Sequence, residues 1–248
     1  HLRDADTKPH VITIDDRIRD SARAVLPFAL TNSQKQALRA IVDDLRRPSP
    51  MNRLLQGDVG CGKTIVALLA ALVAMENDLQ VAFMAPTELL AEQHFLTIRR
   101  LLMSSRFTVA SLTGGGRAAK RRSTIAAIES GVVDLVVGTH ALVQETVRFK
   151  RLGLCVIDEQ HRFGVLQRAN LREKGHQPDV LVMTATPIPR TLALTAYGDL
   201  DVSTIRELPP GRRPIKTKLV PESRRDDVYS FVQRRLKEGR QAYVVYPL

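Results

Sequence analysis

The stretch Gly57–Thr64 reads GDVGCGKT and matches the pattern G-x-x-x-x-G-K-[ST] at every fixed position. A short strand, predicted for residues 53–56, precedes it and a buried helix, predicted for residues 64–75, follows it, which is the context that this pattern requires. Glycines in such a turn let successive backbone N–H groups face a phosphate at a helix N-terminus. Lys63 would neutralise the β- and γ-phosphates, and the Thr64 hydroxyl would ligate Mg²⁺. The stretch therefore predicts a nucleotide-binding P-loop in an α/β domain.

Outward from this turn, short apolar runs alternate with helical stretches along the chain. The runs are rich in Val, Ile and Leu with little alternation, which is typical of strands covered on both faces. The further strands are predicted at residues 81–85, 109–112, 135–137, 154–157 and 180–183, and the further helices at 34–45, 89–103, 118–128 and 188–197. This order predicts an α/β fold with a mainly parallel sheet and helices on both faces.

Composition and charge narrow the class of protein. Of the 248 residues, 44% are apolar and 25% are charged, which excludes a wholly disordered chain. The longest apolar stretch, residues 65–75, is shorter than the about 20 residues that a membrane span needs, and two cysteines cannot form a disulfide framework. With no secretory signal at the start, a cytoplasmic protein that has no membrane partner is predicted.

The net charge of +11 is concentrated late in the chain, because residues 206–240 carry eleven basic and five acidic side chains. A basic surface of this kind suits a polyanion such as nucleic acid. A soluble protein that happens to be basic fits the composition equally well, so charge alone makes nucleic acid no more than a candidate partner.

Two adjacent carboxylates, Asp158 and Glu159, follow the predicted strand at 154–157 in the sequence DEQH. They are poor core residues because the burial of unpaired charge is costly. Beside a P-loop, Asp158 would hold Mg²⁺ through its water shell and Glu159 would accept a proton from the attacking water. Taken alone, an acidic pair after a strand is more often a helix N-cap or a loop, so this assignment depends on the P-loop.

Other polar segments permit a functional and an ordinary structural interpretation. Gln34 could read the adenine edge with its amide and Phe28 could stack on the ring, but a surface Gln and a buried Phe fit as well. The loops at 86–87, 113–116 and 138–140 follow strands and could hold a phosphodiester backbone, or be tight turns. The segment Thr184–Arg190, TATPIPR, taken alone favours a helix cap.

The segment 208–214, LPPGRRP, contains three prolines and a glycine and predicts a linker. We therefore expect an extension or linker from an upstream domain at 1–25, a first domain at 26–205, a linker at 206–223 and the truncated start of a second domain at 224–248. The second domain would begin with a helix at about 224–237. The chain starts with His1 and ends on a strand-like run, 243–248, so we expect a piece of a longer protein.

The order GDVGCGKT, APTELLAEQ, TGGG, VVGTHAL, DEQH and TATPIPR resembles the first motor domain of superfamily 2 helicases. Within that superfamily, the runs DEQHRFG, TATPIPRTLA and ELPPGR are similar to the bacterial RecG family of ATP-dependent DNA helicases. Transcription-repair coupling factors usually show DEEHRFG, so Gln160 and residues 208–212 favour RecG. The resemblance covers roughly residues 26–248.

The resemblance implies a RecA-like P-loop NTPase domain and the beginning of a second one, with ATP and Mg²⁺ as ligands. The residues implied in nucleotide and metal binding and in catalysis are Phe28, Gln34, Gly57, Gly60, Cys61, Gly62, Lys63, Thr64, Asp158 and Glu159. Those implied in contacts with nucleic acid are Thr87, Gly115, Thr139 and His140, and those implied in coupling are His161, Thr184, Thr186 and Arg190. Cys61 departs from the usual Ser or Gly, and we expect this thiol to invite oxidation or alkylation and its modification to block nucleotide binding.

The resemblance also implies a helicase or double-stranded DNA translocase that remodels stalled replication forks and Holliday junctions in DNA repair and recombination, at the bacterial nucleoid. Such motors bind ATP between two RecA-like domains and split branched DNA with a wedge domain. We therefore expect this chain to bind nucleotide, hydrolyse it poorly and unwind nothing. The alternatives are a transcription-repair coupling translocase, a DNA-binding lobe without catalysis and, disfavoured by DEQH, an RNA helicase.

Overall fold

The computed structural model describes residues 7–26, 28–115, 118–158, 177–186, 200–209 and 216–245. The chain divides into two units, residues 1–210 and 211–248, and each is described by itself. The helix predicted at 188–197 and three predicted site residues, Glu159, His161 and Arg190, lie outside the described residues.

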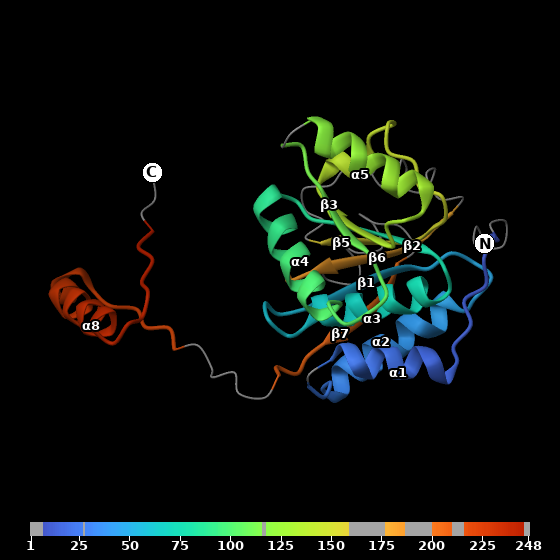
Figure 1. Ribbon diagram of the computed structural model, residues 1–248. Coiled ribbons are helices and arrows are strands. Elements are labelled where there is room, and N and C mark those ends of the chain that lie inside the picture. Colours follow the sequence, from blue (N-terminus) through green and yellow to red (C-terminus); the bar gives the residue numbers. More distant parts are fainter. Residues whose placement is uncertain are drawn as a thin grey trace. The chain divides into compact units, whose positions relative to one another are not determined.

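Unit 1 is built on a parallel β-sheet whose described part has seven strands (Figure 1). The strands are β1 (Asn52–Gly57), β2 (Gln80–Met84), β3 (Val109–Leu112), β4 (Leu135–Gly138), β5 (Leu152–Asp158), β6 (Asp179–Thr184) and β7 (Asp201–Ile205). Their order is β3-β4-β2-β5-β6-β1-β7, and every described pair is parallel. The predicted α/β fold with a parallel sheet is confirmed. Strand β7 was not predicted, because it is an edge strand in which three of the five residues are polar.

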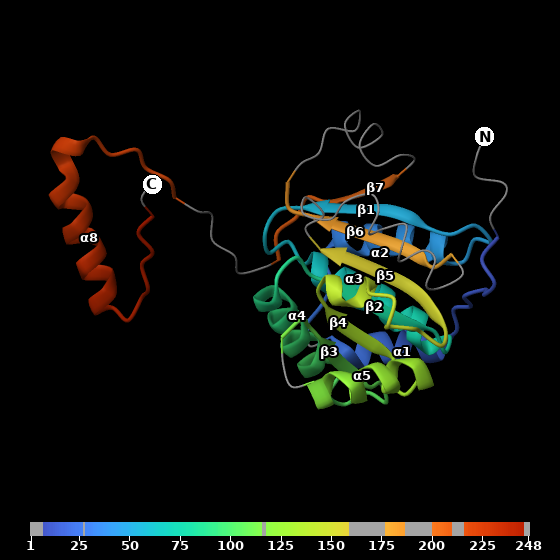
Figure 2. The ribbon, with the colours of Figure 1, turned by 90° about the horizontal axis from the view of Figure 1, so that it is seen from above.

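Helices cover both faces of this sheet (Figures 1 and 2). They are α1 (Asp16–Val25), α2 (Asn32–Leu45), α3 (Lys63–Glu76), α4 (Glu88–Leu101), α5 (Ala118–Ser130) and the short 3₁₀ helix η1 (His140–Val143). Buried residues of α1 to α4 belong to one hydrophobic core, whereas those of α5 and η1 belong to another. In the part of the chain that the structure describes, no helix is long and apolar enough to cross a bilayer.

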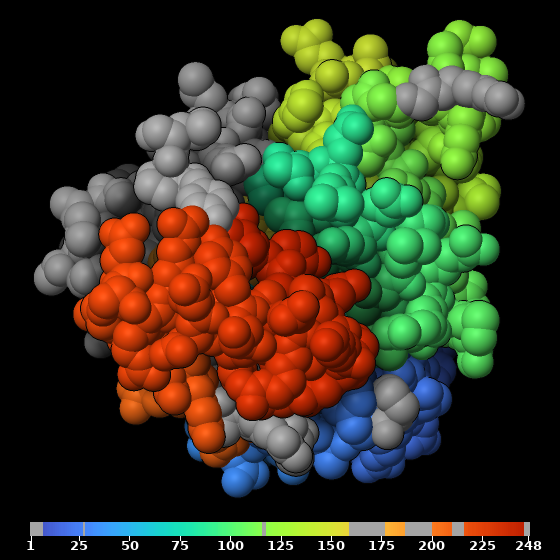
Figure 3. Space-filling model, turned by 90° about the vertical axis from the view of Figure 1, so that its left-hand side faces the viewer, coloured from blue at the N-terminus to red at the C-terminus, as the bar shows by residue number. Residues whose placement is uncertain are grey.

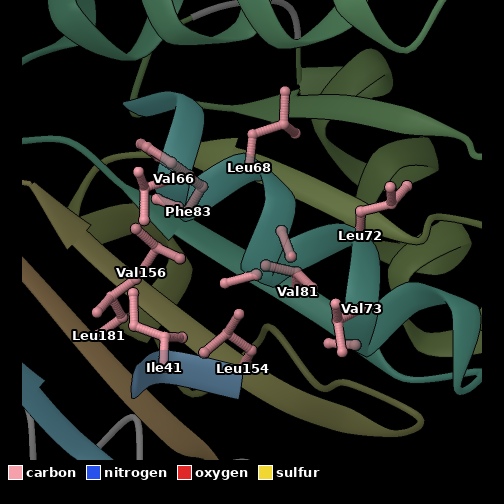
Figure 4. Packing of buried hydrophobic residues seen from close by; sticks show 14 of the residues in the cluster. Ile41, Val66, Leu68, Leu72, Val73, Val81, Phe83, Leu154, Val156 and Leu181 are labelled. Carbon is pink, nitrogen blue, oxygen red and sulfur yellow. The ribbon is translucent and has the colours of Figure 1, made fainter. Parts of the chain in front are cut away.

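The strands divide their residues between these two cores. In β2, Val81 and Phe83 belong to the first core, whereas Ala82 and Met84 belong to the second. Because successive strand residues point to opposite faces and both faces are covered, the strands read as continuous apolar runs. Helix α3 is apolar all round and is buried from Val66 to its end. Figure 4 shows its side chains among those of β2, β5 and β6.

The amino-terminal segment packs on the rest of unit 1. Helix α1, which the sequence analysis missed, begins at an N-cap, Asp15, that accepts a hydrogen bond from the Ile18 backbone N–H. Ile12 and Ile18 are 1% and 3% exposed and join the first core. The helix escaped notice because half of its residues are charged and it buries only two residues, so its packing stabilises it more than its own pattern does.

Unit 2 contains the 3₁₀ helix η3 (Glu222–Arg224) and α8 (Arg225–Lys237), which confirms the helix predicted there. No residue of α8 is buried. The strand predicted near the end of the chain is not formed over 241–245, where the backbone is irregular. A strand needs a neighbour for its backbone hydrogen bonds, and the described residues of unit 2 provide none. The domain boundaries given above stay a prediction.

Candidate active site

The P-loop and Asp158 lie at the same edge of the sheet, where β1 and β5 end on either side of β6 (Figure 2). Leu55 of β1 pairs with Met183 of β6, and Met183 pairs with Asp158 of β5. Adjacent strands are about 4.8 Å apart, so the backbones at Leu55 and Asp158 are separated by about 10 Å. The fold thus brings the predicted phosphate-binding turn and the predicted metal ligand to the edge at which open parallel sheets bind ligands.

Two glycines shape the turn. Gly62 has φ +95° and forms the N-cap of α3, and a Cβ there would collide with the Gln34 side chain, so both the backbone and the neighbour require glycine. A Cβ on Gly57 would lie 2.6 Å from the Cys61 Sγ and 2.8 Å from the Ile205 carbonyl oxygen. No side chain caps α3, so its first backbone N–H groups are suited to an anion.

Lys63 folds back over this turn. Its Nζ donates hydrogen bonds to the Gly57 carbonyl at 2.6 Å and to the Asp58 carbonyl at 3.1 Å. The ammonium is therefore held at the loop, where it can neutralise phosphate oxygens. Thr64 follows as the second residue of α3 and is half-buried.

Gln34 supports the P-loop from α2. Its side chain is 2% exposed, donates from Nε2 to the Cys61 carbonyl at 2.8 Å and accepts at Oε1 from the Thr31 N–H at 2.9 Å. The alternative of an ordinary surface glutamine is therefore wrong, and adenine reading would require the amide to leave the Cys61 carbonyl. Phe28 is 49% exposed, so the alternative of a buried phenylalanine is also wrong.

Cys61 lies beneath the turn and is 1% exposed. Burial raises the pKa of its thiol, and the nearby charge of Lys63 offsets this only in part. A buried thiol whose pKa is raised reacts slowly, because the thiolate is the nucleophile. In this conformation of the loop we therefore expect Cys61 to be alkylated slowly, and the effect of its modification on nucleotide binding stays a prediction.

The predicted metal ligand has a contact that was not expected from the sequence. His94 of α4 places its Nε2 2.7 Å from the Asp158 Oδ2, and the His94 ring lies 4.8 Å from the Phe83 ring, centroid to centroid. Asp158 itself is 8% exposed. The only sequence signal for this contact is that His94 lies two helical turns into the helix after β2, the strand beside β5.

Thr184 is the last residue of β6, between the P-loop and Asp158 at the edge of the sheet, and Thr186 follows two residues later. Thr184 pairs with Gln56 of β1 and is fully buried. Its Oγ1 lies 2.9 Å from the Thr186 Oγ1 and accepts from the Thr186 N–H at 3.2 Å. The two residues thus form a local turn stabilised by a hydroxyl, at the place where coupling residues are predicted.

The predicted nucleic-acid residues lie in loops after β2, β3 and β4. Thr87 is the N-cap of α4, and its hydroxyl accepts from the Leu90 N–H at 3.3 Å. The Gly115 N–H donates to Glu88 Oε1 at 2.8 Å, which joins the first two loops. Figure 3 shows the face on which α4 lies between the blue amino-terminal part and the yellow-green part around α5.

The loop after β4 differs from expectation. His140 is exposed, but Thr139 is 2% exposed and its Oγ1 is buried without a hydrogen-bond partner among the described residues. In this conformation the Thr139 hydroxyl is not exposed to a backbone phosphate, and the implied contact stays a prediction. Arg121, which the sequence analysis did not single out, donates to Gln144 Oε1 at 2.6 Å and to the Thr113 carbonyl at 3.2 Å, and so joins the loops after β3 and β4.

This site fits a Mg²⁺ ion that is also bound by the phosphates of a nucleotide. Over the described ranges, no group of three His, Cys, Asp or Glu could hold a metal ion. Mg²⁺ usually binds one or two carboxylates together with substrate phosphates and waters, so Asp158 and the Thr64 hydroxyl fit this donor set. These residues therefore fit the magnesium ion of a nucleoside triphosphate.

Comparisons with known proteins agree with this site. Residues 31–195 match the family model described as DEAD/DEAH box helicase. The ATP-dependent DNA helicase RecG of Synechocystis sp. is 54% identical over 90% of this chain and 27% of its own length, and that of Aquifex aeolicus is 51% identical over 96% of this chain and 30% of its own. The chain thus spans less than a third of the length of these two relatives.

A solved structure of RecG bound to a three-way DNA junction has a TM-score of 0.84 to this chain and is 46% identical over 96% of it, or 32% of that chain. The likeness thus includes both the sequence and the fold. The chain therefore belongs to the DEAD/DEAH box helicase family, and it is similar over nine-tenths or more of its length to RecG helicases.

Proposed function

We propose that this chain is the ATP-binding lobe of an ATP-dependent helicase or double-stranded DNA translocase that remodels stalled replication forks and Holliday junctions in DNA repair and recombination. The observation that carries the proposal is the meeting of the P-loop and Asp158 across β6. The similarity to RecG, one member of which is bound to a three-way DNA junction, supports branched DNA as the partner. With DNA as partner, a bacterial cytoplasmic protein associated with the nucleoid is proposed.

In the proposed mechanism, the turn around Gly60 and Gly62 binds the ATP phosphates through backbone N–H groups at the N-terminus of α3. Lys63 would neutralise the β- and γ-phosphates. Thr64 and Asp158 would hold Mg²⁺, which would neutralise charge that develops on the transferred phosphoryl group. Glu159 is proposed to accept the proton of the attacking water.

The DNA side of the proposal involves the loops after β2, β3 and β4. Thr87, Gly115 and His140 are proposed to contact the phosphodiester backbone, so recognition would depend on DNA shape rather than base sequence. His161, Thr184, Thr186 and Arg190 are proposed to couple hydrolysis to these contacts. Closure of two RecA-like lobes on ATP and their reopening would move the DNA.

The proposed motor needs parts beyond the ATP-binding lobe. A second RecA-like domain would supply arginine fingers, which contribute roughly 10³–10⁵ in rate in related P-loop enzymes. A wedge domain of the parent protein would split the junction. The isolated chain is therefore proposed to bind nucleotide, to hydrolyse it slowly and to unwind nothing.

A nucleotide-binding titration tests the proposal. A fluorescent ATP analogue is titrated into the wild-type chain, into Lys63→Ala and into Lys35→Ala, a matched control on the exposed side of α2. We expect Lys63→Ala to weaken binding at least about tenfold, since it removes a charge paired with phosphate, and Lys35→Ala to leave it unchanged. Equal binding by Lys63→Ala and the wild type would contradict the proposal and favour a lobe that binds DNA without catalysis.

A further inference from the structure

We propose that His94 is a positioning residue, which orients the Asp158 carboxylate for Mg²⁺. This inference rests on the proposed function, in which Asp158 is the metal ligand. None of the sequence motifs considered above assigns a role to His94, and it is separated from Asp158 by 64 residues along the chain.

The contact is short and shielded. The His94 Nε2 and the Asp158 Oδ2 are 2.7 Å apart, and the two side chains are 13% and 12% exposed. This distance is typical of a hydrogen bond that involves a charged group. An ionised carboxylate can only accept, so the hydrogen must be on Nε2, and the contact excludes the neutral tautomer whose proton is on Nδ1. Among the described side chains, no other donates a hydrogen bond to Asp158.

The His94 ring is itself held in place. The Phe83 ring of β2 lies 4.8 Å away with an interplanar angle of 48°, and Phe83 is fully buried in the first core. A ring packed this way has few alternative rotamers, so it can direct a hydrogen bond with little loss of entropy. Packing against the core therefore holds the His94 ring in place, and the hydrogen bond from His94 holds the Asp158 Oδ2 in place.

This arrangement leaves the other oxygen, Oδ1, for the metal. Asp158 is the last residue of β5, where the side chain would otherwise be free to rotate at the sheet edge. Carboxylates that bind metals are commonly held by hydrogen bonds from a second group, and loss of that group weakens metal binding by roughly 10–100-fold. His94 is placed to perform this function.

His94 is not needed to hold α4 on the sheet. Ala91 and Ile98 of the same helix are fully buried and belong to the first core, and Thr87 caps the helix. Replacement of His94 by an apolar residue of similar size should therefore leave α4 in place. This allows the positioning function to be separated from a purely structural one.

The test is a Mg²⁺ titration of the binding of a fluorescent ATP analogue to the full chain. His94→Leu removes the donor and keeps an apolar side chain against Phe83, whereas His94→Gln retains an N–H. Glu92→Gln, on the exposed side of α4, is the matched control. We expect His94→Leu to raise the half-saturating Mg²⁺ concentration at least about tenfold. For His94→Gln this concentration should lie between those of His94→Leu and the wild type, and Glu92→Gln should behave as the wild type. Binding in EDTA should be the same in all four proteins, because the phosphate cradle is intact.

An NMR measurement of the imidazole nitrogens in the wild-type chain, without metal, is the second readout. We expect the Nε2–H tautomer or the doubly protonated ring, and its signature should change in Asp158→Ala. A neutral ring with its proton on Nδ1 would overturn the inference. So would a half-saturating Mg²⁺ concentration in His94→Leu within twofold of the wild type, or an equal loss of binding with and without Mg²⁺.

Asp158→Ala separates this inference from the proposed function. If Asp158→Ala removes the Mg²⁺ dependence and His94→Leu does not change it, the inference about His94 fails and the proposed function stands. If Asp158→Ala leaves the Mg²⁺ titration unchanged, the proposed metal ligand is wrong, and the inference fails with it.

Discussion

Replacement of Gln34 by alanine tests whether this side chain supports the P-loop or reads adenine. Gln34→Ala removes the hydrogen bonds to the Cys61 carbonyl and from the Thr31 N–H. At about 1 kcal/mol each, their loss lowers the free energy of unfolding by about 2 kcal/mol. The Gln34 N–H still donates to the Thr31 hydroxyl, so α2 keeps half of its capping box.

The effect on nucleotide affinity follows from the same contacts. The bond to the Cys61 carbonyl holds the P-loop backbone in its phosphate-binding form, and about 1 kcal/mol of lost loop order corresponds to about fivefold weaker binding. The lost order affects the P-loop backbone that binds the phosphates and not the base. The affinities for analogues of ATP and of GTP should therefore fall by the same factor. Gln36→Ala, on the exposed side of α2, is the control for both measurements.

The assays are urea unfolding and nucleotide titration. The chain has no tryptophan, so circular dichroism is the suitable probe of unfolding. Unchanged stability together with a selective loss of ATP over GTP binding would refute the reasoning, because it would show that Gln34 acts on the base and not on the loop.

Three further predictions concern buried groups. Asp179 is fully buried and pairs with Lys8 at 3.0 Å, so Lys8→Met should lower the free energy of unfolding by about 3–5 kcal/mol, and a further Asp179→Asn should recover most of this in urea unfolding; equal costs for the single and double variants would contradict it. Cys61 should react with iodoacetamide only slowly until denaturant is added, because burial raises its pKa, and rapid native labelling would contradict its burial. Burial tends to raise the pKa of Glu76, but hydrogen bonds from Ser21 and Arg106 and the charges of Arg106 and Arg17 outweigh it and lower this pKa below its ordinary 4.5. Its contribution to stability is therefore present above about pH 4.5 and is lost as the pH falls through the lowered pKa, and Glu76→Gln should flatten the acid side of a urea-midpoint profile; an unchanged profile would contradict this.

Local patterns were sufficient for most of the fold and for the centre of the site. The P-loop was identified from its eight residues because glycines at fixed places and a lysine before the helix are needed whatever surrounds them. The strands β1 to β6 were identified because burial on both faces makes each of them an apolar run. Asp158 was identified because a carboxylate at the end of such a run needs a partner.

The missed features all depend on what lies next to a residue in space. Helix α1 and strand β7 have polar patterns that became an ordered helix and strand only by packing on the sheet. The expected strand after α8 lacked a neighbour to pair with among the described residues. Patterns along the chain indicate which residues are buried, but they do not indicate which strand or helix lies beside them.

The sequence by itself determined that this chain has a phosphate-binding turn and an acidic strand end in a parallel α/β sheet, because both are short-range patterns with a fixed geometry. Only the tertiary structure decided that the Gln34 amide supports the P-loop, that Cys61 is buried beneath it and that His94 contacts Asp158. These three contacts join residues from different elements. Their distances are set by how the helices pack on the sheet, which no local pattern encodes.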